Sequence, residues 1–234
     1  MWDNAALIRQ LANTLIVGCV LVLLCGAAYY TVHMQELVPL RNVRLSAAPQ
    51  RVDTAAVLQV VRNEVRGNLF TVDIENLRQA LEKLPWVRSV NIRREFPGRL
   101  AVQLEEHQVL ARWNSNALVN RQGEVFAAES TQMLPSFIGP EGASAEVAQQ
   151  YLQFSQQLAE LNLRVTQLAL SPRHAWQLRL SNGVVLELGR EEMQQRVARF
   201  VVGYPYSQAA LQGAAVKYVD LRYRNGFAVR VERG

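Results

Sequence analysis

The residues that could carry acid–base or metal chemistry are few and scattered along the chain. His33, His107 and His174 have no second His or Cys at the spacing of a metal site. The densest cluster is Glu105, Glu106 and His107, but neighbouring residues of a strand point to opposite faces of a sheet. We interpret this cluster as the end of a strand, and the sequence predicts no metal site.

Nucleophile and phosphate-binding motifs are incomplete as well. Ser144 lies in Gly142-Ala-Ser-Ala-Glu146, which lacks the last Gly of the Gly-x-Ser-x-Gly motif, and its place before a helical pattern predicts a helix cap. Neither Gly-x-x-x-x-Gly-Lys nor Gly-x-Gly-x-x-Gly occurs. We therefore expect no enzyme and no cofactor, although the carboxylates of a hydrolase could still converge in the fold.

An uncharged apolar stretch runs from Leu11 to Val32, and about 20 apolar residues suffice to span the hydrocarbon core of a bilayer. It predicts one transmembrane helix over 11–32, preceded by a cytoplasmic tail over 1–10. A cleaved signal peptide would have a shorter apolar region and a more basic start, and a lipoprotein would carry a small residue, not Leu24, before Cys25. A buried soluble helix is rarely uncharged for six turns.

Charge and cysteine use agree with a domain outside the membrane. The net charge of +5 comes mainly from Arg spread along the chain, so a basic tail for nucleic acid is not expected. Both cysteines, Cys19 and Cys25, lie in the apolar stretch, and the rest of the chain suits an oxidising compartment. Because long domains translocate largely regardless of charge, we expect the large C-terminal part in the periplasm.

The first part of this outer region has the pattern strand, helix, helix, strand, strand. Val43 and Leu45 alternate with polar residues, and two helical patterns open at Asp53 and Asp73, each Asp acting as an N-cap. A strand with a bulge follows from Val87, and Phe96-Pro97-Gly98 predicts the turn into the last strand.

The second part predicts a mixed α/β domain, so the fold class of the whole chain is α+β. Apolar residues at helical spacing follow Val147, and Asn182-Gly183 predicts a hairpin. A further helical pattern leads to the end of the chain, where Tyr218 to Val231 predicts an antiparallel hairpin turning at Asn225-Gly226. Tyr223 is expected in its first strand.

Several separated motifs resemble one protein family. Asn68-Leu-Phe-Thr-Val-Asp73, Leu84-Pro-Trp-Val87 and Arg94-Glu-Phe-Pro-Gly-Arg-Leu100 are similar to the POTRA module of the bacterial FtsQ/DivIB division proteins. Leu118-Val-Asn-Arg-Gln-Gly-Glu-Val-Phe126 is similar to the entry into that family's second domain. The resemblance implies a POTRA domain over 38–107 and an FtsQ-type β domain over 108–234 whose C-terminal strand binds a partner.

The resemblance also implies a function. It implies an essential, non-enzymatic divisome scaffold at the division septum, anchored in the inner membrane, that links early to late division proteins and helps control septal peptidoglycan synthesis. The implied partners are FtsB and FtsL, with FtsB in direct contact, FtsW and FtsI reached through them, and FtsK through the POTRA domain. The alternatives are a POTRA-containing translocation or envelope-assembly factor and a membrane-anchored cell-wall hydrolase.

The expected mechanism is strand addition to the last strand of the chain. If this strand, Phe227 to Arg233, lies at the side of the sheet, its free backbone groups would template an incoming strand. Tyr223 would anchor the partner and Arg222 would pair with a partner carboxylate. The positions that match the family's FtsB-binding segment are Arg222, Tyr223, Asn225, Gly226, Phe227, Ala228, Val229 and Val231.

Overall fold

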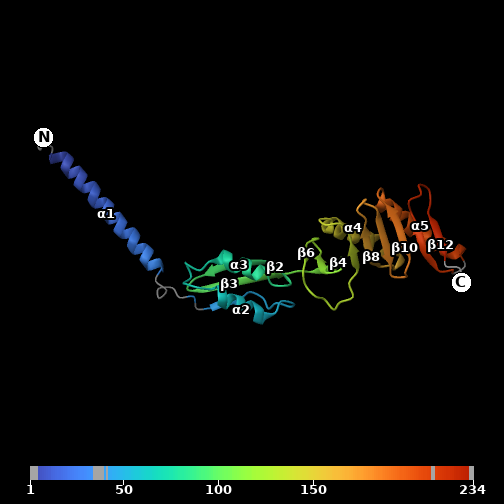
Figure 1. Ribbon diagram of the computed structural model, residues 1–234, viewed down its shortest axis with the longest axis horizontal. Helices are drawn as coiled ribbons and strands as arrows, with labels where there is room; N and C mark the ends of the chain where they lie inside the picture. The colour runs from blue at the N-terminus through green and yellow to red at the C-terminus, as the bar shows by residue number, and fades with distance from the viewer. Residues whose placement is uncertain (1–4, 34–39, 41, 212–213, 232–234) are drawn as a thin grey trace. The chain divides into compact units, whose positions relative to one another are not determined.

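The computed structural model describes residues 5–33, 40, 42–211 and 214–231, which form two compact units over 1–106 and 107–234. Figure 1 traces the elements from the N- to the C-terminus. The start of the expected tail at 1–4, the first two residues of the expected POTRA domain and the end of the last strand at 232–233 lie outside the described residues.

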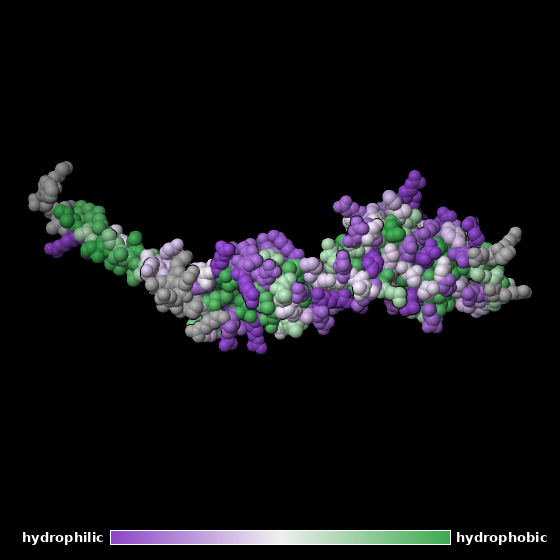
Figure 2. All heavy atoms as spheres, turned by 60° about the horizontal axis from the view of Figure 1, so that its bottom comes forward, coloured by the Kyte–Doolittle hydropathy of each residue, from purple (hydrophilic) through white to green (hydrophobic). Residues whose placement is uncertain are grey.

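The first unit opens with an apolar helix, α1 (Ala5–His33). By length and composition, one helix in the described part of the chain is apolar enough to cross a membrane, over Leu7–Thr31 with a mean hydropathy of 2.3. Figure 2 shows it as a largely apolar surface. Residues 5–10, which we expect in the tail, continue this helix, since Ala-Ala-Leu-Ile favours helix as much as the span does.

The rest of this unit has the predicted order of strand, helix, helix, strand and strand. Its three-stranded sheet has the order β1-β3-β2, with β1 parallel and β2 antiparallel to the central β3. The predicted bulge occurs between Val87 and Ser89. The elements are β1 (Asn42–Leu45), α2 (Thr54–Glu64), α3 (Ile74–Glu82), β2 (Val87–Glu95) and β3 (Arg99–Glu106).

Both helices begin at the predicted caps. Asp53 accepts a hydrogen bond from the amide of Ala55, and Asp73 accepts one from the amide of Asn76 (3.0 Å), so each carboxylate satisfies a free amide of the first turn. Leu77 of α3 is completely buried and packs in a core shared by both helices and the sheet. Its burial contributes about 1.5–3 kcal/mol.

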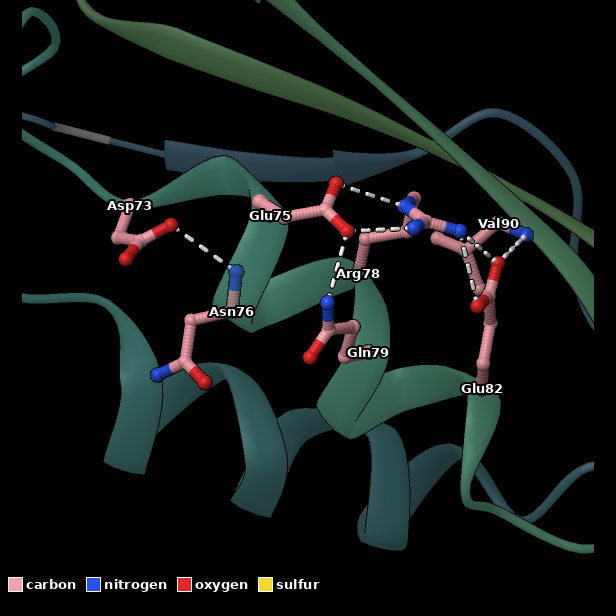
Figure 3. A network of polar contacts seen from close by, with 7 residues as sticks. All are labelled: Asp73, Glu75, Asn76, Arg78, Gln79, Glu82 and Val90. Carbon is pink, nitrogen blue, oxygen red and sulfur yellow. Dashed lines mark hydrogen bonds and ion pairs between the residues drawn. The ribbon is translucent and has the colours of Figure 1, made fainter.

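A polar network on α3 reaches the outer edge of β2 (Figure 3). The guanidinium of Arg78 lies between Glu75 (2.5 Å) and Glu82 (2.9 Å), and the Glu82 carboxylate also accepts a hydrogen bond from the Val90 amide at 3.3 Å. Hydrogen bonds from Arg78 and Gln79 lower the pKa of Glu75 to about 2. Val90 belongs to β2, which is an edge strand of this sheet. The Glu82 side chain therefore satisfies one backbone amide at the edge, where no neighbouring strand pairs with it in the described residues.

Glu106, at the end of β3, holds the loop after β1. Its carboxylate accepts hydrogen bonds from the amides of Gln50, Arg51 and Val52 at 2.9–3.0 Å. The guanidinium of Arg51 also stacks over the ring of Trp86, 4.4 Å from its centroid.

The second unit is one mixed sheet of nine strands, in the order β12-β11-β10-β9-β8-β7-β4-β5-β6. Its pairs are antiparallel except for β4 with β7, β7 with β8 and β10 with β11. The last two of these are joined by the helices α4 and α5, as parallel neighbours require a crossover. The elements are β4 (Val109–Trp113), β5 (Ala117–Asn120), β6 (Val125–Phe126), β7 (Ser136–Ile138), α4 (Ser144–Leu158), η1 (Ala159–Leu161), β8 (Val165–Leu170), β9 (Trp176–Leu180), β10 (Val185–Gly189), α5 (Met193–Ala210), β11 (Val216–Asp220) and β12 (Ala228–Val231).

The predicted α+β class, with an apolar N-terminal helix, a POTRA-like order and a mixed second domain, is confirmed. The hairpin at Asn182-Gly183 joins β9 to β10 as predicted, with Gly183 at φ +87°. The helical stripe from Val147 lies on α4, and Phe154 from this stripe is completely buried against Trp176. These side chains form the core between the sheet and its helices.

Truncating Glu106 should destabilise the first unit more than truncating its neighbour Glu105. We expect Glu106→Ala to lower the free energy of unfolding by about 1–3 kcal/mol, because three amides lose a charged acceptor. Glu105→Ala, which removes an exposed pair with Arg88, should cost less than about 1 kcal/mol. Urea unfolding, with hydrogen exchange to locate the change in 50–52, measures both; equal losses would contradict the role of Glu106.

Candidate partner-binding edge

The sequence-level candidates for acid–base chemistry have separate structural partners. Glu106 holds the loop at 50–52, whereas His107 contacts the side-chain amide of Asn120 (3.0 Å) and stacks on Phe126. The prediction that Ser144 caps α4 is wrong, because Ala143 is the N-cap and the Ser144 hydroxyl donates to the carbonyl of Gly123 at 2.7 Å. Within the described ranges, no group of three or more His, Cys, Asp or Glu could hold a metal ion.

The last described strand, β12, stands at one end of the nine-stranded order, so the condition for strand addition stated above is met. The hydrogen bonds of β11 show which backbone groups of β12 face outward. At the end of the β10–β11 ladder, the amide of Leu221 donates to the carbonyl of Glu187 at 2.9 Å, so the backbone groups of Leu221 face β10. Backbone groups alternate between the two neighbours of a strand, so Asp220 faces β12, opposite Ala228. The next residue of β12, Val229, therefore turns its amide and carbonyl toward the outer edge.

The predicted tight turn at Asn225-Gly226 is wrong. β11 ends at Asp220, and residues 221–227 form the connection to β12, so Tyr223 lies in this connection with 58% of its surface exposed. The physical reason is local. The carboxylate of Asp220 accepts a hydrogen bond from the amide of Arg222 at 3.0 Å, which bends the chain two residues on and ends the strand.

Asp220 also forms an ion pair with the side chain of Arg222. The guanidinium donates from Nε (2.9 Å) and Nη2 (2.7 Å) to the two carboxylate oxygens. This bidentate pair lowers the pKa of Asp220 and raises that of Arg222. The Arg222 guanidinium is therefore already bound to a carboxylate of its own chain. Its remaining N–H groups are the ones that could donate to a partner carboxylate, the role predicted for it.

Helix α5 fixes the other end of the connection. The ring of Phe227 packs against Phe200, with centroids 6.2 Å apart, and lies so close to Gly203 that a Cβ there would sit 2.8 Å from the ring. Arg199 donates to the carbonyl of Arg224. An open, mainly apolar groove of about 480 Å³ lies between the helix and the connection, lined by Ala198, Arg199, Val202, Gly203, Asn225, Gly226 and Phe227.

The two faces of β12 differ. Ala228 and Arg230 are exposed, and the guanidinium of Arg230 lies 5.4 Å from the centroid of the Tyr218 ring. Phe227, Val229 and Val231 are partly buried and pack on the core below. The predicted site residues are therefore brought together, with Arg222, Tyr223, Asn225 and Gly226 in the connection and the others at its end and along the strand.

Sequence reasoning missed Asp220, Gly203 and Arg199. The signal for Asp220 was present, since an Asp two residues before a basic residue at the end of a strand favours a side-chain turn. The roles of Gly203 and Arg199 depend on contacts across more than twenty residues, which no local pattern carries.

Comparison with known families assigns both domains that follow α1. The family model for the FtsQ-type POTRA domain matches residues 38–107, and the model for the C-terminal region of cell division protein FtsQ/DivIB matches residues 111–222. The protein described as cell division protein FtsQ in Nitrosospira multiformis is 41% identical over the whole length of both chains. The chain belongs to the FtsQ/DivIB family.

Other relatives agree with this membership. The FtsQ protein of Burkholderia pseudomallei is 37% identical over 98% of this chain and 94% of its own. That of Escherichia coli is 38% identical over 70% of this chain and 62% of its own. This family of membrane-anchored cell-division proteins works through protein–protein interactions, and α1 fits a single-pass anchor. The family-model match ends at Arg222, so most of the candidate edge lies beyond it.

Replacing Asp220 by Ala should loosen the connection at 221–227, because it removes the acceptor of the Arg222 amide and the partner of the Arg222 guanidinium. The folded-state pKa of Asp220 is depressed, so its stabilisation is present above the unfolded-state pKa and is lost as pH falls through the lower folded value. We expect the hydrogen-exchange protection factor of the Arg222 amide to hold down to about pH 4 and to fall below it. In Asp220→Ala the protection factor should be low at every pH, with about 1–3 kcal/mol of stability lost.

Glu187→Ala is the matched control, because it removes a neighbouring carboxylate whose partner is Gln177 and should leave the Arg222 amide protected. An unchanged protection factor in Asp220→Ala would show that the pair does not order the connection.

Proposed function

We propose that this chain is a non-enzymatic divisome scaffold that binds the FtsB/FtsL complex by adding a strand of FtsB to the outer edge of β12. FtsW and FtsI would be reached through this complex, and FtsK would contact the POTRA domain. With α1 in the inner membrane, the N-terminus lies in the cytoplasm and the two domains lie in the periplasm at the septum. In this place the scaffold links early to late division proteins and helps control septal peptidoglycan synthesis.

The observation that carries the proposal is the outer edge of β12. In the described part of the chain no strand pairs with this side of β12, so Val229 presents an amide donor and a carbonyl acceptor there. An incoming strand would satisfy both groups and continue the ladder, which is the basis of binding by strand addition. Family membership supports the choice of partner.

The surroundings of the edge support a specific contact. Tyr223 is exposed and its connection is held in place by Asp220 and Arg199, so its ring can serve as an anchor at a small entropic cost. The groove beside Phe227 offers an apolar pocket for a partner side chain. Arg222 and Arg224 lie in the connection, Arg199 bonds to its backbone, and Arg230 lies on β12. Asp220 pairs with Arg222, and the remaining excess of positive charge favours an acidic partner segment.

The sharpest test removes the outward amide without touching the inner ladder. Val229→Pro deletes the donor that faces away from β11, a position where an edge strand tolerates proline. We expect it to abolish capture of the FtsB/FtsL complex by the full-length chain in detergent, measured by co-purification and titration. Tyr223→Ala should weaken binding by about 2 kcal/mol or more, as the loss of an aromatic anchor does.

Val229→Ile is the matched control, since it keeps the amide and the apolar side chain and should bind normally. In cells depleted of the native protein, the Pro variant should give filaments without septa and the Ile variant should divide. Normal binding by Val229→Pro and Tyr223→Ala together would refute the edge as the site, and normal septation with defective outer-membrane assembly would favour the translocation alternative.

A further inference from the structure

Two phenylalanines of the POTRA domain point into solvent. Phe96, in the turn between β2 and β3, is 78% exposed, and Phe70, in the connection between α2 and α3, is 53% exposed. Neither side chain contributes to the core of the domain. Exposed large apolar side chains that gather at one place often mark an interaction surface.

Both phenylalanines lie at the same end of the domain. The first residue of β1, Asn42, pairs with Arg99, directly after the turn that carries Phe96. Arg94 joins the second loop to this end, because its guanidinium donates to the carbonyls of Leu69 (2.8 Å) and Val72 (3.1 Å), on either side of Phe70. Figure 1 shows the start of β1, the β2–β3 turn and the α2–α3 connection together at one end of this domain.

This end is the one from which the chain runs to its membrane anchor. The apolar span of α1 ends at Thr31 and β1 begins at Asn42, so residues 32–41 join the two. Ten residues reach at most about 35 Å even when fully extended. With α1 in the membrane as proposed, the length of the chain keeps the end that carries both phenylalanines within about 35 Å of the bilayer surface.

The charges at this end suit an anionic lipid surface. Arg66, Arg93 and Arg99 are exposed beside the two loops, and Arg94 adds a fourth positive charge. The carboxylates at the same end are Glu95, the helix cap Asp73, Glu64, which accepts a hydrogen bond from Asn76, and Glu75, which pairs with Arg78. Glu95 is the one carboxylate next to the β2–β3 turn, beside Arg93, Arg94 and Arg99, so positive charge exceeds negative charge around Phe96. Aromatic side chains flanked by arginines are typical of segments that lie in the interface of a membrane, where apolar area enters the headgroup region and cations meet anionic lipids.

We propose that the anchor-proximal end of the POTRA domain, formed by Phe70, Phe96 and the surrounding arginines, inserts into the interface of an anionic phospholipid bilayer. The two rings enter the headgroup region and the guanidinium groups bind lipid phosphates. The domain then stands on the membrane in a fixed orientation instead of rotating freely on its tether. This contact does not depend on the proposed binding of FtsB.

The test places a probe at each position of the full-length chain in vesicles. In a Cys19→Ala, Cys25→Ala background, single variants Phe70→Cys, Phe96→Cys and Ala48→Cys carry a nitrobenzoxadiazole label. Ala48 is an exposed control in the loop after β1, at the opposite end of the domain. In phosphatidylglycerol–phosphatidylcholine vesicles we expect labels at 70 and 96 to shift to the blue and lose iodide quenching, while the label at 48 stays quenched.

A second readout leaves the native side chains in place. Hydrogen exchange of 68–72 and 94–99 should slow when the unlabelled chain is moved from phosphatidylcholine to phosphatidylglycerol vesicles. The double variant Phe70→Ser, Phe96→Ser should lose this protection, and so should Arg93→Glu with Arg99→Glu. Leu58→Ser, which changes an exposed apolar residue of α2, should keep it.

Equal iodide quenching at 48, 70 and 96 in anionic vesicles would overturn the proposal. Shielding of 70 and 96 that appears only when a purified division protein is added would also overturn it, and would assign this end to a protein partner. Loss of FtsB capture in the edge variants with unchanged shielding at 70 and 96 would leave the membrane contact supported.

Discussion

The parallel pairing of β10 with β11 determines what the second domain presents to other proteins. Parallel neighbours cannot be joined by a tight turn, so the chain must leave the sheet after Gly189, cross over as α5 and return at Val216. The chain then reverses through residues 221–227, and β12 pairs antiparallel to β11. The position of β12 at the side of the sheet follows from this crossover, and the crossover helix also supplies the surface on which Phe227 packs.

Local patterns predicted the elements but not the way they are joined at the candidate site. The caps Asp53 and Asp73 and the hairpin at Asn182-Gly183 could be predicted because each depends on residues a few positions apart. The closing turn at Asn225-Gly226 could not, because an Asp220 side chain competes with the strand and Phe227 prefers the surface of α5. Tertiary contacts here outweigh a strong hairpin signal, as they often outweigh local propensity.

Several carboxylates bind backbone amides in the structure. Glu106 accepts from three amides, Asp220 ends a strand, and Glu82 covers the Val90 amide at the edge of β2. The last of these contrasts with β12. The POTRA sheet has a side chain of its own on one of its edge amides, whereas the edge at Val229 faces outward without a strand beside it in the described residues. The β12 edge of the second domain is therefore more open to an added strand than the β2 edge of the POTRA domain.

If a partner strand adds to β12 as proposed, the open edge also sets an order of assembly. A strand that pairs with β12 satisfies the groups of Val229 but carries a row of unpaired amides and carbonyls on its own far side. The sheet is lengthened and not closed, so the newcomer becomes the template for any strand that follows. An assembly built in this way would have a direction: its second member could not be placed before its first, and the four residues of β12 would be the fixed end from which it grows.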